Sequence, residues 1–297
     1  MRSRLIDLIA VVAALHALAS EPLSARTLTV GSITDKAAQE FRTWNPFIRY
    51  LARQLASDDI EDGKLVTARD SLEMARYLRE GSVDLFIDSP LVALGVSRAS
   101  GSILFMRRWK DGVAEYQSVI FTRADSPLQR AADLAGRKIA FKSADSTSSY
   151  VVPRLWIERA QLRLIGLENH RALAPAGQVG FIFSGSDENG LFQVLAGHVE
   201  ASAMGSHELM RLAPAGAIKV IAQSEPLPRQ LVSHRGGLPA PLVARIRAVL
   251  IGMEQTEEGR NILAAFEKTT RFDDLAPESL DRIRAIADGP MERASTQ

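Results

Sequence analysis

Short apolar segments of strand type alternate with helix-like segments along most of the chain, and this alternation limits the possible folds more than any other feature. A first series runs over residues 27–106. A polar break follows at 124–127, and a second series runs over 137–212. Alternation of this kind is typical of mostly parallel sheets covered by helices. The sequence therefore predicts an α/β fold with two such units.

The individual elements follow from periodicity and from capping residues. We expect strands at residues 27–33, 65–68, 83–88, 103–106, 116–123, 137–141, 179–183, 199–204, 218–222 and 231–234, with helices between them and after residue 240. Residues 34–42 are expected to form a polar loop, and Asn45–Pro46 is expected to begin a helix, because proline suits the first helical position. The basic segment 107–110 is expected to be a solvated surface turn. Residues 161–178 show no pattern that places them.

A chain of 297 residues is long enough for about two domains. We expect two α/β lobes, each a mostly parallel sheet flanked by helices. The chain crosses out of lobe 1 near 117–124 and returns near 218–230. Lobe 1 then comprises residues 26–118 and 225–297, and lobe 2 comprises 119–224. A cleft between two such lobes is a common place for a ligand, and hinge closure is the usual motion.

The N-terminus has the pattern of a secretory signal peptide over residues 1–25. Two arginines precede an apolar run at 5–18, which is too short for a comfortable membrane span, and small residues permit cleavage after Ala19 or Ala25. The alternative is an N-terminal helix that is not cleaved. We expect export and a location in the periplasm.

Composition and motifs exclude several classes of function. The chain has no cysteine, which rules out disulfides and thiol catalysis, and its net charge of +1 gives no indication of a nucleic-acid partner. No signature of an enzyme, a phosphate-binding loop or a metal site is present, and the histidines are scattered. Asp84 and Asp88 share one face of a strand, where a structural role is expected. We predict a protein that is not an enzyme and needs no metal or cofactor.

One polar run stands where a predicted strand passes into a predicted helix. Ser146, Thr147 and Ser148 follow the strand at 137–141 and precede the helix at 150–160. A helix start has unpaired N–H groups and partial positive charge, and hydroxyls add further donors, so the run suits a small oxyanion. The alternative is an ordinary N-cap. Loops at 32–42 and 88–90, which end two strands of lobe 1, are the candidate opposite walls.

Several segments match, in order and spacing, a known family. They are Trp44–Leu51, Leu78–Phe86, Tyr116–Ile120, Asp133–Phe141 with Ser146–Tyr150, Phe183–Ser186 and Gly197–Ala201. With these, the chain resembles the periplasmic phosphate/phosphite/phosphonate-type substrate-binding proteins of ABC transporters, over about residues 27–255. The resemblance implies a two-lobed periplasmic-binding-protein-like (type II) fold and capture of a small tetrahedral oxyanion. It places anion contacts on Ser146, Thr147 and Ser148 and a ligand contact on Tyr116, for which a partly buried strand aromatic is the alternative.

The chain also departs from the family pattern at places that face the ligand. Asp187 stands where the family usually has a histidine, and an aspartate would repel a phosphonate unless it is protonated or pairs with a ligand amine. The turn with Ser89, a candidate ligand contact, lacks the tyrosine that often follows it. Arg229 or Gln230 occupies the place of an acidic residue, and Glu200 that of an aspartate. The identity of the ligand therefore stays open.

The main hypothesis is an exported solute-binding protein that captures a small oxyanion resembling phosphonate, phosphate or phosphite and delivers it to an ABC permease. It is expected to act as a monomer, without nucleic acid. One alternative is a periplasmic sensory protein that presents its ligand to a membrane sensor kinase. A third is an enzyme on the same fold.

Overall fold

The computed structural model describes residues 26–288, so the predicted signal peptide lies outside the described residues. The strands are β1 (Arg26–Ile33), β2 (Ile60–Ala68), β3 (Leu85–Asp88), β4 (Ile103–Lys110), β5 (Glu115–Tyr116), β6 (Ser118–Arg123), β7 (Lys138–Phe141), β8 (Leu164–Gly166), β9 (Val179–Phe183), β10 (Ala201–Gly205), β11 (Ile218–Gln223), β12 (Leu227–Pro228), β13 (Leu231–His234) and β14 (Thr269–Asp274). The helices are α2 (Ala37–Gln54), α3 (Ser71–Glu80), α4 (Pro90–Ser100), α5 (Val152–Arg159), α6 (Asp187–Leu195), α7 (Ser206–Leu212), α8 (Ala240–Gly252), α9 (Glu257–Ala265) and α10 (Pro277–Asp288). Within this range, no helix has the length and apolar character needed to cross a membrane.

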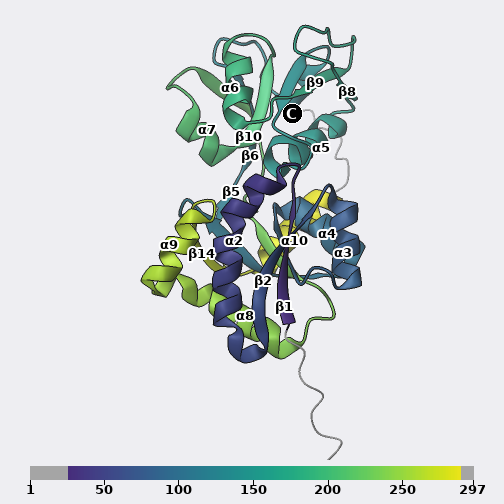
Figure 1. Cartoon of the computed structure of the whole chain (residues 1–297). Coiled ribbons are helices and arrows are strands. Elements are labelled where there is room, and N and C mark those ends of the chain that lie inside the picture. The colour runs from purple at the N-terminus through teal and green to yellow at the C-terminus, as the bar shows by residue number, and fades with distance from the viewer. Residues whose placement is uncertain (1–25, 289–297) are drawn as a thin grey trace, which may run out of the picture.

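Two sheets divide the molecule into an upper and a lower half (Figure 1). The lower half, which we call lobe 1, contains a six-stranded sheet in the order β14-β4-β13-β3-β1-β2. Strands β1, β2 and β3 run parallel, β13 is antiparallel to both β3 and β4, and β14 is antiparallel to β4. Four of these strands therefore run in one direction. The sheet is mixed because β13, which belongs to the returning chain, lies antiparallel between β3 and β4.

The upper half, lobe 2, has a six-stranded sheet in the order β11-β6-β10-β7-β9-β8. Strand β7 is parallel to β9 and β10, and β8 is parallel to β9. Strand β6, the outgoing crossing strand, is antiparallel to its neighbours β10 and β11. Five strands thus run one way, which confirms the predicted α/β lobes built on mostly parallel sheets.

A two-stranded ribbon joins the lobes. Strands β5 and β12 pair antiparallel, with Tyr116 opposite Leu227 and Glu115 opposite Pro228. The predicted crossing strand is interrupted at Gln117, so β5 belongs to this ribbon and β6 to lobe 2. We propose that the lobes divide at 118/119 and 224/225, which puts the ribbon at both crossings.

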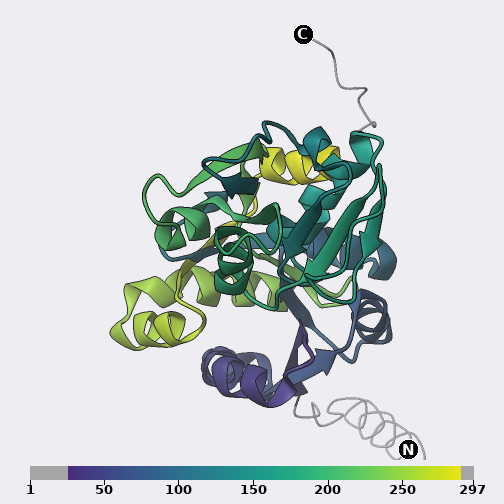
Figure 2. The same ribbon diagram turned by 90° about the horizontal axis from the view of Figure 1, so that it is seen from above.

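Each sheet is covered by apolar side chains on both faces. In β3, Leu85 and Ile87 join one buried cluster with α2 and α8, whereas Phe86 joins another with α3 and α4. In β6, Ile120 faces one cluster and Phe121 the other. Successive side chains of a strand point to opposite faces, so such fully apolar strands need helices on both sides. Seen from above, α10 lies on the side of the molecule away from α2 (Figure 2).

Two local predictions are wrong. Helix α2 begins at Ala37 instead of Asn45, and it contains Pro46 in its interior. The buried stripe of this helix, with Trp44, Phe47 and Ile48, offsets the missing backbone hydrogen bond at the proline. The segment 107–110 is not a surface turn, because it forms the end of β4 and the side chain of Arg108 is fully buried. Part of the unplaced segment 161–178 forms β8.

Candidate functional site

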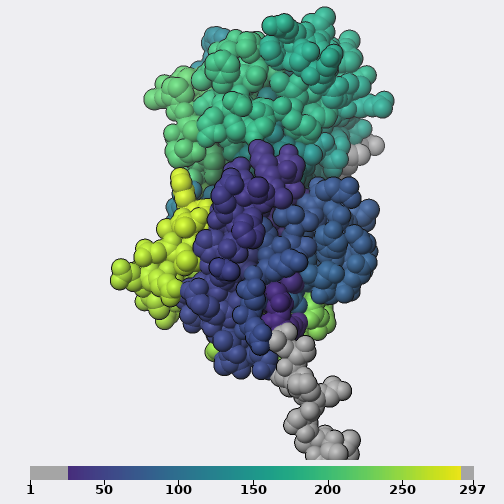
Figure 3. Space-filling view, viewed as in Figure 1, coloured from purple at the N-terminus to yellow at the C-terminus, as the bar shows by residue number. Residues whose placement is uncertain are grey.

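A polar cavity of about 150 Å³ lies between the two lobes. Its walls contain all six residues that the sequence singled out. The lining residues are Ser89, Lys110, Tyr116, Lys142, Ser146, Thr147, Ser148, Asp187, Gly205, Glu208, Arg229 and Gln230. Ligand pockets for larger molecules have volumes of roughly 300–1,000 Å³, so this cavity suits a small molecule. On the face drawn in Figure 3, the start of α2 meets atoms of lobe 2 across the boundary.

The cavity lies at the carboxyl ends of parallel strands from both lobes. Ser89 follows β3 and Lys110 ends β4 in lobe 1, whereas Lys142 follows β7 and Gly205 ends β10 in lobe 2. Loops at the carboxyl ends of such strands are the usual place for a ligand. The topology of two separate sheets thus brings these side chains to one point.

The polar run after β7 forms the first turn of a helix. Ser146 caps a π-helical turn, Thr147–Val151, which continues into α5, and the Ser146 hydroxyl oxygen accepts a hydrogen bond from the backbone N–H of Ser149 at 3.1 Å. The N-cap alternative is therefore correct for Ser146, although the residue also lines the cavity. A hydroxyl that accepts through its oxygen can still donate its proton. The cap orients Ser146 without using up its donor.

Thr147 and Ser148 are held by contacts with other parts of the chain. The Thr147 hydroxyl, in a residue 1% exposed, accepts from the backbone N–H of Leu91 at the start of α4, at 3.3 Å, and so links lobe 2 to lobe 1. The Ser148 carbonyl accepts from the hydroxyl of Ser118 at 2.7 Å. The Ser148 side chain is hydrogen-bonded to Tyr116, whose pKa is raised to about 12 by burial. Tyr116 is consequently a neutral phenol.

Ser89 reaches the cavity from lobe 1, but its hydroxyl already has partners. It donates to Oδ1 of Asp88 at 3.0 Å and lies 3.4 Å from the carbonyl oxygen of Asp145 in lobe 2. The backbone N–H of Ser89 donates to the same Oδ1 at 2.6 Å. Burial raises the pKa of Asp88 to about 7, although the hydrogen bonds from Ser89 oppose this shift. Ser89 can therefore offer a ligand mainly its oxygen.

Basic side chains form the part of the site that the sequence did not reveal. Lys110, Lys142 and Arg229 all line the cavity. Arg229 is 7% exposed; its Nη1 lies 3.3 Å from Oε1 of Glu208, and its guanidinium is 4.7 Å from the centre of the Tyr116 ring. Within residues 26–288, Nε and Nη2 of Arg229 have no hydrogen-bond partner. The sequence marked this position only as a departure from the family pattern.

A neighbouring lysine removes the repulsion that Asp187 would exert on an anionic ligand. Asp187 Oδ2 lies 3.1 Å from Nζ of Lys142, which directly follows β7. The carboxylate of Asp187 is thus neutralised by the protein's own cation, so it does not present a free negative charge to the cavity.

Behind Lys110 lies a buried cation. The side chain of Arg108 is fully buried, with Nη2 at 2.7 Å from Oε2 of Glu267 and its guanidinium 4.8 Å from the centre of the Phe266 ring. Lys110 Nζ lies 3.8 Å from the same carboxylate oxygen. Burial lowers the pKa of Lys110, as do the neighbouring Arg108, Lys142 and Arg229, whereas Glu267 raises it. Three cations and one carboxylate therefore act on Lys110.

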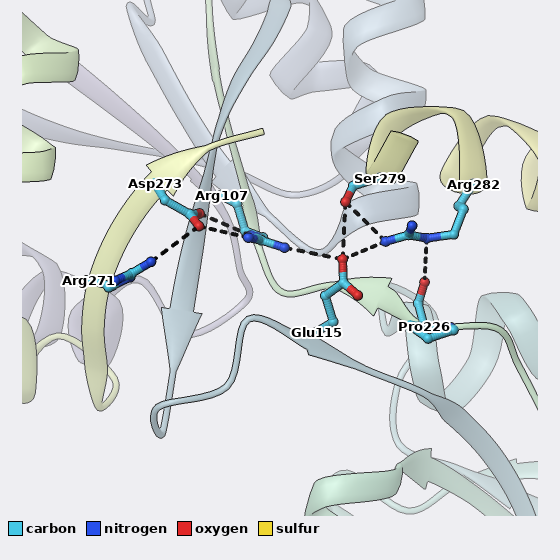
Figure 4. A network of polar contacts seen from close by, with 7 residues as sticks. All are labelled: Arg107, Glu115, Pro226, Arg271, Asp273, Ser279 and Arg282. Atoms are coloured by element: carbon cyan, nitrogen blue, oxygen red, sulfur yellow. Dashed lines mark hydrogen bonds and ion pairs between the residues drawn. The ribbon is translucent and has the colours of Figure 1, made fainter. Parts of the chain in front are cut away.

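A polar network holds the ribbon that carries Tyr116 and Arg229 (Figure 4). Oε1 of Glu115 accepts from Nη1 of Arg107 at 3.2 Å, from Nη2 of Arg282 at 2.5 Å and from the Ser279 hydroxyl at 3.1 Å. Arg107 also pairs with Asp273 of β14. The C-terminal helix α10 and the edge of the lobe 1 sheet are thereby attached to the hinge ribbon.

Other candidates have structural explanations. Asp84 pairs with Arg26 and Arg235, which agrees with the structural role expected for it. Across residues 26–288, no group of three or more acidic or histidine side chains could hold a metal ion. A second inter-lobe cavity of about 590 Å³ shares Lys142 with the first and is otherwise lined by the loops after β1, β2, β7 and β9.

Comparisons with known proteins agree with this fold. A family model described as "ABC transporter, phosphonate, periplasmic substrate-binding protein" matches residues 30–280. A protein from Xanthomonas citri, solved with a bound chloride ion, superposes with a TM-score of 0.80 at 24% identity over 89% of this chain and 96% of its own. The same protein has been solved bound to ATP.

Two further structures carry the phosphonate name. The binding-protein component of an ABC phosphonate transporter from Pseudomonas aeruginosa has a TM-score of 0.63 at 17% identity, covering 89% of this chain and 86% of its own. PhnD1 from Prochlorococcus marinus, in complex with methylphosphonate, gives the same TM-score and identity and covers 89% and 98%. At these identities the structures show the fold alone, which is the predicted type II two-lobed one. Because the family model spans most of the chain, this protein belongs to the family of periplasmic phosphonate substrate-binding proteins of ABC transporters.

Proposed function

We propose that the protein captures a small oxyanion of the phosphonate, phosphate or phosphite type between its lobes and delivers it to an ABC permease. The observation that carries this proposal is the convergence of the hydroxyl-rich helix start at Ser146–Ser148 with three basic side chains on one cavity of about 150 Å³. Residues 1–25 would act as the signal peptide and direct export to the periplasm, where a solute-binding protein of this family acts.

The chemistry of the cavity suits an anion with several oxygens. Ser146 and Thr147 have oriented oxygens and hydroxyl protons that remain available, and the helix start adds positive potential. Lys110, Lys142 and Arg229 supply charged donors. Hydrogen bonds in which one partner is charged contribute about 1.5–3 kcal/mol each, so a few of them suffice for tight binding.

The proposed role is binding and release without catalysis. The ligand would be enclosed as the lobes close about the ribbon of β5 and β12, and it would be released when the permease favours the open state. The cavity residues come from both lobes and from the ribbon, so closure would change their mutual distances. An equilibrium of this kind requires no acid–base chemistry.

Isothermal titration calorimetry on the mature protein tests the proposal. Methylphosphonate, phosphate, phosphite and sulfate are compared with dimethyl methylphosphonate, a tetrahedral analogue without charge. At least one oxyanion is expected to bind, and the uncharged ester is expected not to. At a hundred times its dissociation constant, a bound oxyanion should also raise the free energy of unfolding by about 2.7 kcal/mol. The proposal would be rejected if the ester bound as tightly as the anions, or if none of the anions bound.

A further inference from the structure

The charges around the cavity are arranged in pairs with one cation in excess. Asp187 is paired with Lys142, and Glu208 with Arg229. The remaining lining cation, Lys110, shares its acidic partner Glu267 with Arg108. These ion pairs thus join four cations to three carboxylates, and a further nearby carboxyl, that of Asp88, has its pKa raised to about 7 by burial.

This pairing decides which substituents of a phosphonate the site can accept. An ammonium group requires a carboxylate whose charge is not already compensated, because its desolvation is costly. Both carboxylates on the cavity wall have a cation within 3.3 Å. An ammonium placed beside them would also meet the positive potential of Lys110 and Arg229, and like charges at short range repel each other.

The same wall has donors to spare for a second anionic group. Arg229 uses Nη1 for Glu208, while Nε and Nη2, which form one fork of the guanidinium, are buried and have no hydrogen-bond partner among residues 26–288. Such a fork matches a carboxylate with two parallel hydrogen bonds. Lys110 has only the shared Glu267, at 3.8 Å, and so its charge is incompletely satisfied.

We propose that the ligand is an oxyanion whose substituent carries a second negative charge, held by Lys110 and Arg229, and that the ion pair between Lys142 and Asp187 excludes ammonium substituents. The inference rests on the proposed function, since it names the substrate class of the same cavity. The Ser146–Ser148 turn binds the phosphonate end, and the opposite wall, from β4 and the ribbon, binds the acidic end.

Three phosphonates with one linking carbon test this assignment by calorimetry. Phosphonoacetate ends in a carboxylate, ethylphosphonate in a methyl group and aminomethylphosphonate in an ammonium group. We expect phosphonoacetate to bind at least tenfold more tightly than ethylphosphonate, and aminomethylphosphonate at least tenfold more weakly. Equal affinities, or a preference for the amine, would overturn the inference while leaving the proposed function intact. Absence of binding by all three while phosphate or phosphite still binds would likewise overturn the inference, whereas absence of binding by every oxyanion would count against the proposed function.

Single substitutions then test the residues. Arg229→Met is expected to reduce the preference for phosphonoacetate over ethylphosphonate to less than threefold. Lys142→Met uncovers the Asp187 carboxylate, so it should raise the affinity for aminomethylphosphonate relative to ethylphosphonate about tenfold, a gain that misfolding cannot produce. Arg211→Met, which breaks the surface pair with Glu188 outside the cavity, is the matched control and should keep the original order. An unchanged order in Lys142→Met would contradict the role of that ion pair.

Discussion

The two walls of the cavity are built in different ways. The lobe 2 wall at Ser146–Ser148 consists of neutral hydroxyls, which are oriented by hydrogen bonds with backbone groups close by in space, such as those of Ser149 and Leu91. The opposite wall consists of Lys110 and Arg229, which lie far apart in the sequence and are held by ion pairs with Glu267 and Glu208. One wall is made by a local turn and the other by tertiary convergence.

This difference assigns separate tasks to the two walls. Hydroxyls and backbone N–H groups bind any oxyanion of suitable size, and their contribution depends little on salt. Charged side chains determine which net charge the ligand may carry. Outside the cavity, their electrostatic attraction for the ligand is screened by salt. We therefore expect the hydroxyl wall to determine affinity in general and the charged wall to determine selectivity among anions.

Removing the hydroxyl wall should have the largest effect. Ser146→Ala combined with Thr147→Ala is expected to weaken oxyanion binding by about 3–6 kcal/mol, since each lost donor to a charged group contributes about 1.5–3 kcal/mol. The loss should be similar for every anion that binds and similar at low and high salt. Calorimetry with methylphosphonate and phosphate at two ionic strengths measures it.

A control is needed because both hydroxyls also support the fold. Ser146 is a helix cap and Thr147 satisfies the Leu91 N–H, so the double variant should lose stability as well, and its folded state is checked by circular dichroism before titration. Ser126→Ala, which removes a turn hydroxyl of lobe 2 outside the cavity, should leave binding unchanged. An unaltered dissociation constant in the double variant would refute the anion contact.

The carboxyl of Asp88, which accepts hydrogen bonds from Ser89 beside the cavity, should make the stability of the protein depend on pH. The pKa of Asp88 is raised from 3.8 to about 7, so the folded protein retains a proton there that the unfolded chain has already released. Stability should therefore fall as the pH rises from about 4 to 7. Asp88→Asn removes this loss. At pH 8 the variant is expected to be more stable by about 2–4 kcal/mol, since one pKa unit corresponds to about 1.4 kcal/mol.

Urea unfolding of both proteins at pH 4.5, 6 and 8 measures this difference. The advantage of Asp88→Asn should be smallest at pH 4.5, at about 1 kcal/mol, and should grow across the series. Glu61→Gln neutralises an exposed carboxylate that is not among the charges acting on Asp88, and it should give a difference of less than about 0.5 kcal/mol that does not vary with pH. A constant difference for Asp88→Asn would show that its carboxyl is ionised throughout this range.

The neutral wall could be predicted from the sequence because its causes are local. Strand–helix alternation fixed the two lobes, and a hydroxyl run between β7 and α5 had to lie at the carboxyl end of a strand. Tyr116, Ser89 and Asp187 also line this cavity, and their contact with a ligand stays a prediction.

The charged wall could not be predicted in the same way. The segment 107–110 has the composition of a solvated turn, and Arg108 can be buried only because Glu267 and Phe266, more than a hundred residues away, pack against it. Single-sequence periodicity has no access to such long-range pairing. The lysine beside Asp187 was missed for the same reason, because the two residues are 45 positions apart.

The smallest expected effect concerns the network that holds the charged wall (Figure 4). Glu115→Gln keeps an accepting oxygen but removes the charge that pairs with Arg107 and Arg282. Partly exposed ion pairs contribute about 0.2–1 kcal/mol each, so urea unfolding should show a loss of about 0.5–1.5 kcal/mol. Because the ribbon carries Arg229 but not the hydroxyl turn, selectivity for phosphonoacetate should fall slightly while methylphosphonate affinity stays within threefold.

Glu80→Gln, which breaks an exposed pair on α3, is the control and should change neither stability nor selectivity. A loss of methylphosphonate affinity as large as that of the hydroxyl variant would mean that the two walls are not independent.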